Sequence, residues 1–209
     1  MADESGEPQE QPEADPWRGA ILPSNIEPPA PPTRTPTWRA VQSPWLVAAL
    51  VIATFNLYAM WWLGRTWSQL KQEDQDQGKH PVWHVLAILV PIYGYFRFHA
   101  HMRTIANLAA TPEAGATLNP VAMTLAWIVI NVLSTTTLRR DVPAWVGLLA
   151  GVLFGALIGW AQYGLNTTWR SLPGGTVRAR LHPLHILLLF LGGVLLTIAI
   201  VAPDQEVVG

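Results

Sequence analysis

Residues 143–165 read PAWVGLLAGVLFGALIGWAQYGL, and no charged side chain interrupts them. An α-helix rises 1.5 Å per residue, so this stretch is long enough to cross the ~30 Å hydrocarbon core of a bilayer. Its glycines recur at every fourth residue, which keeps them near one helix face where another backbone can approach closely. The stretch therefore predicts a membrane-spanning helix with a packing face formed by Gly147, Gly151, Gly155 and Gly159.

Four further stretches share this length and polarity: 45–64, 82–98, 121–138 and 183–202. All five stretches together contain one charged residue, Arg97. The whole chain is 13% charged, compared with about 25% for a soluble domain. We therefore expect an all-α protein, a polytopic membrane helix bundle with about five transmembrane helices.

The segments before and after this bundle differ from it in composition. Six carboxylates and no basic residue occupy residues 1–15, and ten prolines lie between Pro8 and Pro44. So few apolar side chains cannot offset the entropy of ordering the backbone. We expect residues 1–43 to be a disordered acidic, proline-rich tail, residues 44–203 to form the helical domain, and residues 204–209 to be a short tail.

The composition also excludes several functional classes. The chain has no cysteine, which removes disulfide scaffolds, thiolate catalysis and thiolate metal sites. It has no basic stripe for nucleic acid and no nucleotide, hydrolase or metalloprotease motif. We therefore expect a protein that is not an enzyme, takes no cofactor and binds no nucleic acid.

The distribution of lysine and arginine predicts the orientation in the membrane, because these residues favour the cytoplasmic side. Five crossings would place seven of them on the side of the N-terminus, namely Arg34, Arg39, Arg97, Arg103, Arg170, Arg178 and Arg180. The opposite side would hold five, namely Arg65, Lys71, Lys79, Arg139 and Arg140. The count favours a cytoplasmic N-terminus.

The chain matches itself when it is shifted by 102 positions. Residues 46–89 then align with residues 148–191, and the identities include Trp67 with Trp169 and His80-Pro81 with His182-Pro183. Five crossings would make this an inverted repeat, a plan found in transporters. Pro91 interrupts the second stretch, and if residues 82–98 were re-entrant the two copies would be parallel and all the histidine pairs could face one side. After the first span of each copy, we expect an amphipathic elbow along the membrane surface, at about 65–76 and 166–173, with Trp67 and Trp169 as interfacial anchors.

Six histidines lie near the ends of the apolar stretches: His80, His84, His99, His101, His182 and His185. Pairs spaced by three or four residues share a helix face, and imidazole is a common ligand of metals and haem iron. A hydrated interfacial role is the simpler interpretation, since no carboxylate neighbours them as a supporting ligand partner. In the five-span topology, His80 and His84 are external and the other four are cytoplasmic.

Two asparagines lie near the centres of the first and third stretches, Asn56 and Asn131. The first interpretation of these two side chains is a hydrogen bond between them that joins the two helices, and the second is a polar contact to a substrate. Trp127 is expected to pack between helices. The hydroxyls from Ser134 to Thr137 are expected to bond carbonyls of their own helix.

The segment NLYAMWWLGRTWSQLK at residues 56–71 resembles a family of small bacterial multi-pass membrane proteins of unknown function. In that family a span ends in tyrosine, further aromatic residues and a basic residue, and continues into an amphipathic elbow. PIYGYFR at residues 91–97 looks like a second, weaker instance. The resemblance covers about residues 45–105. It implies a bacterial cytoplasmic-membrane location, and it implies no activity or catalytic residue.

These observations favour a non-enzymatic integral membrane protein that acts through helix packing, as a scaffold or an accessory subunit. Its expected partners are the lipid bilayer and either a second copy or a larger membrane complex, bound through the Gly147–Gly159 face. The first alternative is a small transporter or channel, favoured by the repeat and by Asn56 and Asn131. The second alternative is a histidine-ligated metal- or haem-binding subunit.

Overall fold

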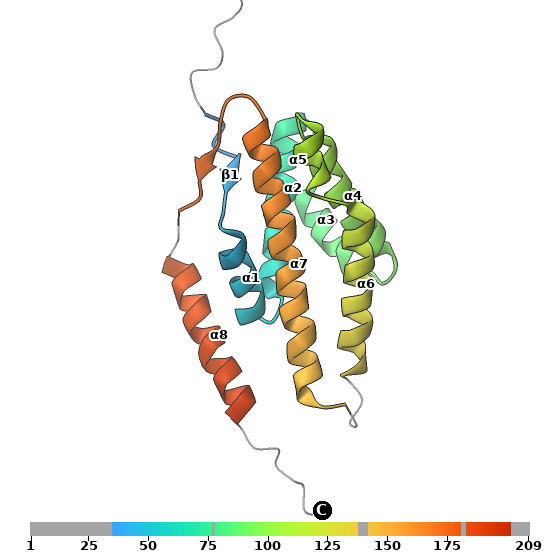
Figure 1. Ribbon diagram of the computed structural model, residues 1–209, viewed down its shortest axis with the longest axis vertical. Coiled ribbons are helices and arrows are strands. Elements are labelled where there is room, and N and C mark those ends of the chain that lie inside the picture. The colour runs from blue at the N-terminus through green and yellow to red at the C-terminus, as the bar shows by residue number, and fades with distance from the viewer. Residues whose placement is uncertain (1–34, 77, 138–141, 181–182, 202–209) are drawn as a thin grey trace, which may run out of the picture. The chain divides into compact units, whose positions relative to one another are not determined.

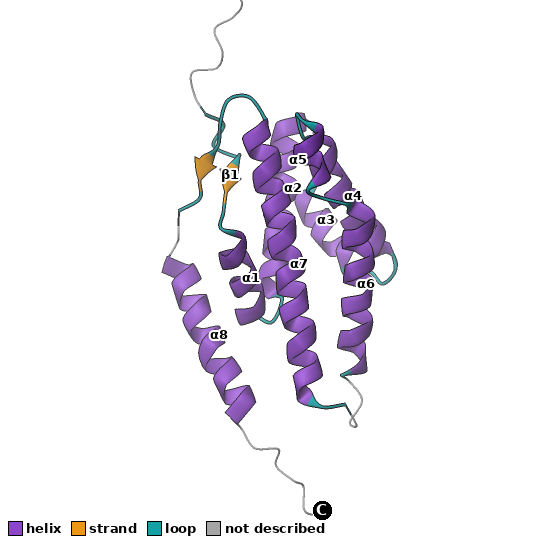
Figure 2. Ribbon diagram, viewed as in Figure 1, coloured by secondary structure: helices purple, strands orange, loops and turns teal. Residues whose placement is uncertain are grey.

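The computed structural model describes residues 35–76, 78–137, 142–180 and 183–201. Nearly all of its regular structure is helical, which confirms the expected all-α class at this level; the exception is one small parallel sheet (Figure 2). The elements are β1 (Ala40–Val41), α1 (Pro44–Ala53), α2 (Leu57–Asp74), α3 (Pro81–Ile88), α4 (Tyr93–Asn107), α5 (Pro112–Ala116), α6 (Pro120–Thr136), α7 (Ala144–Ser171), β2 (Val177–Arg178) and α8 (Pro183–Val201).

The first two apolar stretches each fold as two helices joined by a tight turn. The first breaks at Thr54–Asn56, where Phe55 and Asn56 have φ angles of 49° and 73°. The second breaks at residues 89–92, which include Pro91, a residue without a backbone donor, and Ile92, which has a φ of 65°. The pairs α1–α2 and α3–α4 are therefore hairpins, and neither stretch is the continuous helix that we expected.

Two segments of the described chain are long and apolar enough to cross a membrane, Pro112–Thr136 and Trp145–Ser171. Of the most apolar part of each segment, only 22% and 39% is buried inside the protein. A core helix of a soluble protein would bury most of such a segment, whereas these helices leave apolar side chains exposed. The finding supports membrane association.

Helix α7 is the centre of the packing, and α1 runs antiparallel against it (Figure 1). A methyl group on Gly155 would lie 3.0 Å from the carbonyl oxygen of Ala48, and one on Gly159 would lie 3.1 Å from that of Pro44. Gly151 has no such neighbour within 4 Å, and a methyl group on Gly147 would only touch Thr137 at 3.5 Å. The predicted glycine face is therefore divided, since its second half packs on α1.

The two copies of the repeat run in the same direction. Trp62, in the first half of α2, donates a hydrogen bond to Gln162 of α7. Glu73, near the end of α2, and the carbonyl of Pro173, just after the end of α7, both accept hydrogen bonds from Arg39, so the two helices end close together. The prediction of an inverted repeat is wrong, because the hairpins return the chain to the end from which it came. For the same reason Arg39 and the end of α2 lie together, although the five-span topology placed Arg39 and Lys71 on opposite sides.

The predicted surface elbows are wrong as well. Helix α2 continues to Asp74 and α7 to Ser171, and Trp67 and Trp169 are only 6% and 0% exposed. The apolar face of α2 that includes Leu63 and Leu70 is buried with Trp67. This face packs against other helices, which removes more apolar surface from water than a position on the membrane surface would.

Part of the predicted N-terminal tail belongs to the fold. Strand β1 pairs in parallel with β2, and Arg39 donates hydrogen bonds to both carboxylate oxygens of Glu73 at 2.7 and 2.6 Å. Trp38 Nε1 donates to the same carboxylate at 3.0 Å. The prediction of disorder for residues 1–43 is thus wrong for residues 35–43. Residues 1–34 and the tail 204–209 lie outside the described residues.

This ion pair generates a testable prediction. Glu73→Gln leaves the largely buried Arg39 without a charged partner, and we expect it to lower the free energy of unfolding by about 3 kcal/mol. The hydrogen bonds from Arg39 hold the pKa of Glu73 below 4.5. The stabilisation by the carboxylate is therefore fully present above pH 4.5 and is lost as the pH falls through the lower folded-state pKa.

The measurement is denaturant unfolding in detergent, followed by circular dichroism from pH 7 to pH 3. The difference between the wild type and Glu73→Gln should shrink toward zero at the acid end. Asp76→Asn is the matched control, because its pair with Lys79 is at 3.5 Å with an exposed carboxylate, and such pairs contribute about 0–1 kcal/mol. A difference that stayed constant down to pH 3 would contradict the assignment.

Candidate functional site

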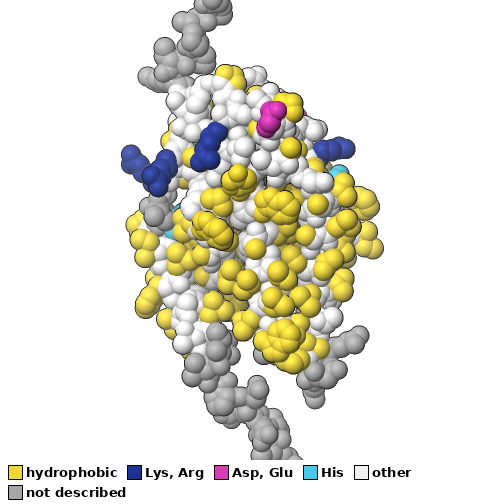
Figure 3. Space-filling model, viewed as in Figure 1, with side chains coloured by type: hydrophobic (Ala, Val, Ile, Leu, Met, Phe, Trp, Pro, Cys, Tyr) yellow, Lys and Arg dark blue, Asp and Glu magenta, His cyan; other side chains and the backbone are white. Residues whose placement is uncertain are grey.

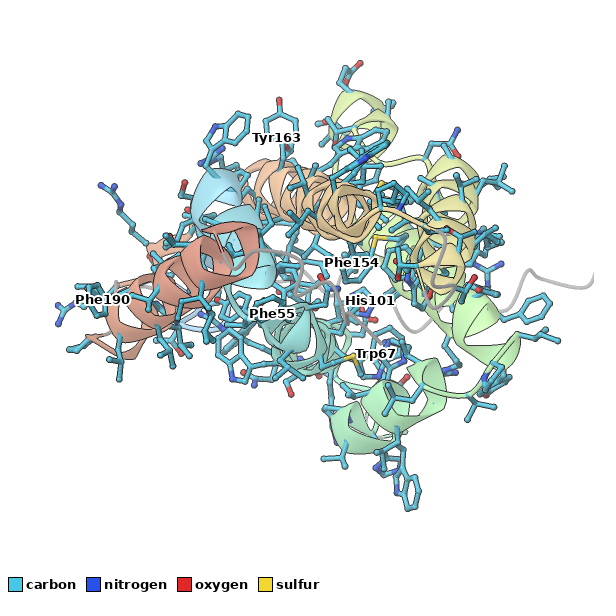
Figure 4. The ribbon with its side chains drawn as sticks, turned by 90° about the horizontal axis from the view of Figure 1, so that it is seen from below. Phe55, Trp67, His101, Phe154, Tyr163 and Phe190 are labelled. Carbon is cyan, nitrogen blue, oxygen red and sulfur yellow. The ribbon has the colours of Figure 1, made fainter. Side chains whose placement is uncertain are left out.

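The α3–α4 hairpin brings two histidines together in the interior. His84 on α3 and His101 on α4 are 1% and 0% exposed, and Nε2 of His84 lies 3.0 Å from Nδ1 of His101. Figure 4 shows His101 near Trp67 inside the bundle, whereas Tyr163 and Phe190 lie at its periphery. The five-span topology placed His84 and His101 on opposite sides of the membrane, so this contact depends on the hairpin.

Arg97 sets the direction of the hydrogen bonds in this pair. A guanidinium has donors and no acceptor, so Arg97 Nη2, at 2.9 Å, must donate to Nδ1 of His84. His84 is then protonated at Nε2 and donates to Nδ1 of His101. His101 in turn donates from Nε2 to the Thr66 hydroxyl at 3.0 Å. Both imidazoles are consequently neutral and share the same tautomer.

The run of hydrogen bonds ends on the backbone of α2. The Thr66 hydroxyl donates to the carbonyl of Trp62 at 2.9 Å. The Trp62 indole donates to Gln162 on α7 at 2.6 Å, and Gln162 donates to Asn166 at 2.7 Å. Asn166 then donates to the backbone carbonyl of Gln42 at 2.6 Å. One polar network thus joins α4, α3, α2, α7 and the segment that follows β1.

Aromatic rings shield this network from water. The Trp67 ring lies parallel to His84 with a centroid distance of 3.9 Å and an angle of 3°, and Trp62 stacks on His101 at 5.9 Å. The Arg97 guanidinium lies 5.8 Å from the centroid of Trp67, within the range of a cation–π contact. Burial, followed by the proximity of His84 and Arg97, lowers the pKa of His101 well below 6.5.

This geometry is suited to holding helices together. A metal needs a free lone pair on an imidazole, but the Arg97 guanidinium occupies that of His84 and His84 occupies that of His101. Among the described residues, no group of three metal-ligating side chains occurs. Proton relay is also disfavoured, because an arginine at the start does not give up its proton. The histidine pair therefore acts as a polar clamp between α2, α3 and α4.

The remaining histidines lie apart from this pair. His80 is exposed and precedes the first residue of α3, and His99 lies 3.4 Å from the Thr124 hydroxyl. His185 is buried against the rings of Tyr58 and Trp61. His182 lies outside the described residues. The structure therefore brings together two of the six candidate ligands.

The two asparagines do not form the pair that we expected. Asn56 lies in the turn before α2 with a left-handed backbone, and Asn131 donates to the carbonyl of Trp127 in its own helix at 2.9 Å. The hairpin is the reason, because it makes residue 56 a turn and not the centre of a span. Trp127 packs between Tyr95 and Phe98 as expected, and the hydroxyls of Thr135, Thr136 and Thr137 bond carbonyls of their own helix.

Two polar residues that carry the network on α7, Gln162 and Asn166, were not among the predicted site residues. Their spacing of four residues at the end of an apolar helix was a usable signal, because it places two amides on one face. Arg97 was predicted to lie on the N-terminal side of the membrane and was the single charge within the apolar stretches, but no partner was predicted for it. Its isolation in an apolar environment was itself a reason to expect a buried partner.

Comparisons of this chain with protein-family models, with curated proteins and with solved structures found no match.

The clamp generates a prediction at Thr66. Thr66→Val keeps the shape of the side chain but leaves the buried Nε2–H of His101 without an acceptor, which costs about 1–3 kcal/mol. Thr66→Ser keeps the hydroxyl and should recover most of that loss. The measurement is denaturant unfolding of both variants in the same detergent.

A spectroscopic readout accompanies it. Histidine-selective ¹⁵N NMR should show His84 and His101 as neutral imidazoles with the proton on Nε2. Equal stability of the valine and serine variants, or a proton on Nδ1 of His84, would be incompatible with the direction of the hydrogen bonds.

Proposed function

We propose that this chain is an integral membrane protein that acts as a non-enzymatic scaffold or accessory subunit of a larger membrane assembly. The observation that carries the proposal is the outward-facing apolar surface. On α6, exposed side chains recur at Val121, Leu125, Val129 and Val132 along one face. On α8, they include Ile186, Leu187, Phe190, Leu191, Val194, Leu195 and Ile198.

Such faces need a covering of lipid or of partner helices. In Figure 3, apolar side chains occupy the middle and lower parts of the visible face, and the charged side chains gather toward its upper end. This separation is typical of a protein with one end in water and an apolar belt in a bilayer.

The topology that we propose has three crossings, α6, α7 and α8, and two hairpins, α1–α2 and α3–α4, that enter from the same end. This arrangement replaces the five separate crossings expected from the sequence. The ends of α2, α4 and α7 meet at the polar end (Figure 1). The basic residues in or next to the ends of these helices and the small sheet are Arg39, Lys71, Lys79, Arg103, Arg170, Arg178 and Arg180. The excess of basic residues favours a cytoplasmic location for that end and for the N-terminus.

Two arguments favour a scaffold over the alternatives. The histidines that suggested a metal or haem site are held as neutral partners of other side chains. The inverted repeat and the asparagine pair, which favoured a carrier, do not occur in the part of the chain that the structure describes. The cytoplasmic membrane of a bacterium is the location that the resemblance at residues 45–105 implies.

The topology is testable with single cysteines, because the chain has none of its own. Asp76→Cys and Val177→Cys should both react with an impermeant thiol reagent in inverted membrane vesicles and remain unlabelled in intact cells. Val142→Cys, in the turn before α7, should show the opposite pattern. Labelling of positions 76 and 177 from opposite sides would contradict the hairpins.

The scaffold role is testable by co-purification. We expect mild solubilisation of the native membrane to recover a stoichiometric partner chain. A photo-crosslinking amino acid at Val129 on α6 or at Ile186 on α8 should form an adduct with that partner. The same probe at Arg170, at the polar end of α7, is the control. A monodisperse protein with lipid adducts only, or solute transport by the purified chain in proteoliposomes, would contradict this function.

A further inference from the structure

A groove of about 670 Å³ lies between the α1–α2 turn, the first half of α2 and the inner face of α8. Its volume falls within the range of about 300–1,000 Å³ that is typical of pockets for small ligands. A groove of this volume is too small for a partner helix. The residues that line it include Tyr58, Arg65, Arg180, Leu188, Leu191 and Leu195. The histidine clamp contributes none of them.

One end of the groove is cationic. Arg65 lies over the ring of Trp61 with its guanidinium carbon 5.1 Å from the centroid, and Arg180 lies shortly before α8. Neither arginine forms an ion pair with a carboxylate of the described residues. Two guanidinium groups on one groove without a carboxylate between them are complementary to an anionic group.

The buried ring of Tyr58 brings a hydroxyl group to the wall of the groove. Its side chain is only 5% exposed, and the Gln42 side chain and the Arg65 guanidinium lie close to its hydroxyl. A phenolic hydroxyl can both donate and accept hydrogen bonds, so it can serve a ligand beside these neighbours. The ring packs edge-on against His185 at 5.9 Å, which keeps the hydroxyl within the groove wall.

The other end of the groove is apolar and reaches the outer surface. Leu188, Leu191 and Leu195 recur at three- and four-residue intervals along α8 and form one wall. Phe55, labelled in Figure 4, and Leu57 line the opposite wall. Since Leu57, Phe55 and Leu191 are also exposed, the groove opens sideways onto the apolar surface that faces lipid in the proposed topology.

From this combination we infer that the groove binds one anionic phospholipid. The phosphate lies between Arg65 and Arg180 and accepts a hydrogen bond from the Tyr58 hydroxyl, and an acyl chain lies along the leucines of α8. Arginine suits this role because its planar donors match the oxygens of a phosphate. Because a lipid site is independent of any partner protein, this inference goes beyond the scaffold role.

The test uses the full chain, freed of lipid in detergent, and native mass spectrometry. Phosphatidylglycerol should bind about tenfold more tightly than phosphatidylcholine with the same acyl chains, because only the former is a net anion. The double variant Arg65→Gln/Arg180→Gln should reduce this preference to less than about twofold. Arg103→Gln/Arg170→Gln is the matched control, since it removes the same charge at exposed positions outside the groove and should keep the preference.

Tyr58→Phe separates a ligand role from a structural role. If the hydroxyl serves the lipid, the variant unfolds at the same denaturant concentration as the wild type but binds phosphatidylglycerol several-fold more weakly. If the hydroxyl serves the fold, stability falls and the lipid preference is unchanged, which would overturn its place in the site. Circular dichroism and gel filtration show whether each variant is folded.

Three results would overturn the proposal as a whole. The first is equal binding of the two lipids by the wild type, and the second is a preference that survives in the Arg65→Gln/Arg180→Gln variant. The third is full displacement of the lipid, either by inorganic phosphate, which would assign the site to a free anion, or by a peptide of residues 1–15, which would assign it to the acidic tail. None of these results depends on whether a partner protein co-purifies, so the scaffold role and the lipid site fail separately.

Discussion

The hydrogen bonds that run from Arg97 through His84 and His101 to Thr66 hold the helical hairpins in place. Each hairpin divides an apolar stretch into two shorter helices, and each of these buries less apolar surface than one long helix would. The network compensates with directional contacts, which are strong in an apolar interior and costly when a partner is missing. Because Arg97 can only donate, every later group in the series has one orientation, and a shifted register of α3 against α4 would leave a buried donor unmet.

Close backbone packing complements this network along the same face of α7, since Gly155, Gly159, Gln162 and Asn166 follow one another at intervals of four, three and four residues. Because Gly155 and Gly159 have no side chain, carbonyl groups of α1 can approach α7 closely. Gly192 of α8 allows the same approach to α1, since a methyl group on Gly192 would lie only 2.1 Å from the carbonyl oxygen of Ala53. Van der Waals contact between helices is the main source of attraction within an apolar solvent, since lipid tails are as apolar as leucine. The hairpin α1–α2 is thus held by the close packing of α1 on α7 and by the hydrogen bonds of Trp62 and Gln42 with Gln162 and Asn166.

Two kinds of apolar surface remain after this packing, and they differ in shape. The outer faces of α6 and α8 are rows of mostly apolar side chains without charged groups, which suits lipid or a partner helix. The surface between α2 and α8 is concave and ends at two arginines and a tyrosine hydroxyl, which suits a molecule with an anionic head and an apolar tail. The difference arises because α8 contacts the rest of the bundle mainly through α1, which leaves a gap beside the wider side chains of α2.

The sequence by itself determined the helical class and the apolar character of the long helices, because these depend on composition and local spacing. It predicted the packing of Trp127 and the local hydroxyl bonds of Thr135 to Thr137 for the same reason. Only the tertiary structure decided that residues 45–64 and 82–98 turn back, since an apolar stretch of that length is compatible with a span and with a hairpin. From that turn follow the parallel repeat, the buried positions of Trp67 and Trp169, and the meeting of His84 with His101. Hydropathy measures how apolar a segment is, whereas the direction in which it leaves the bundle depends on contacts with residues far away in the chain.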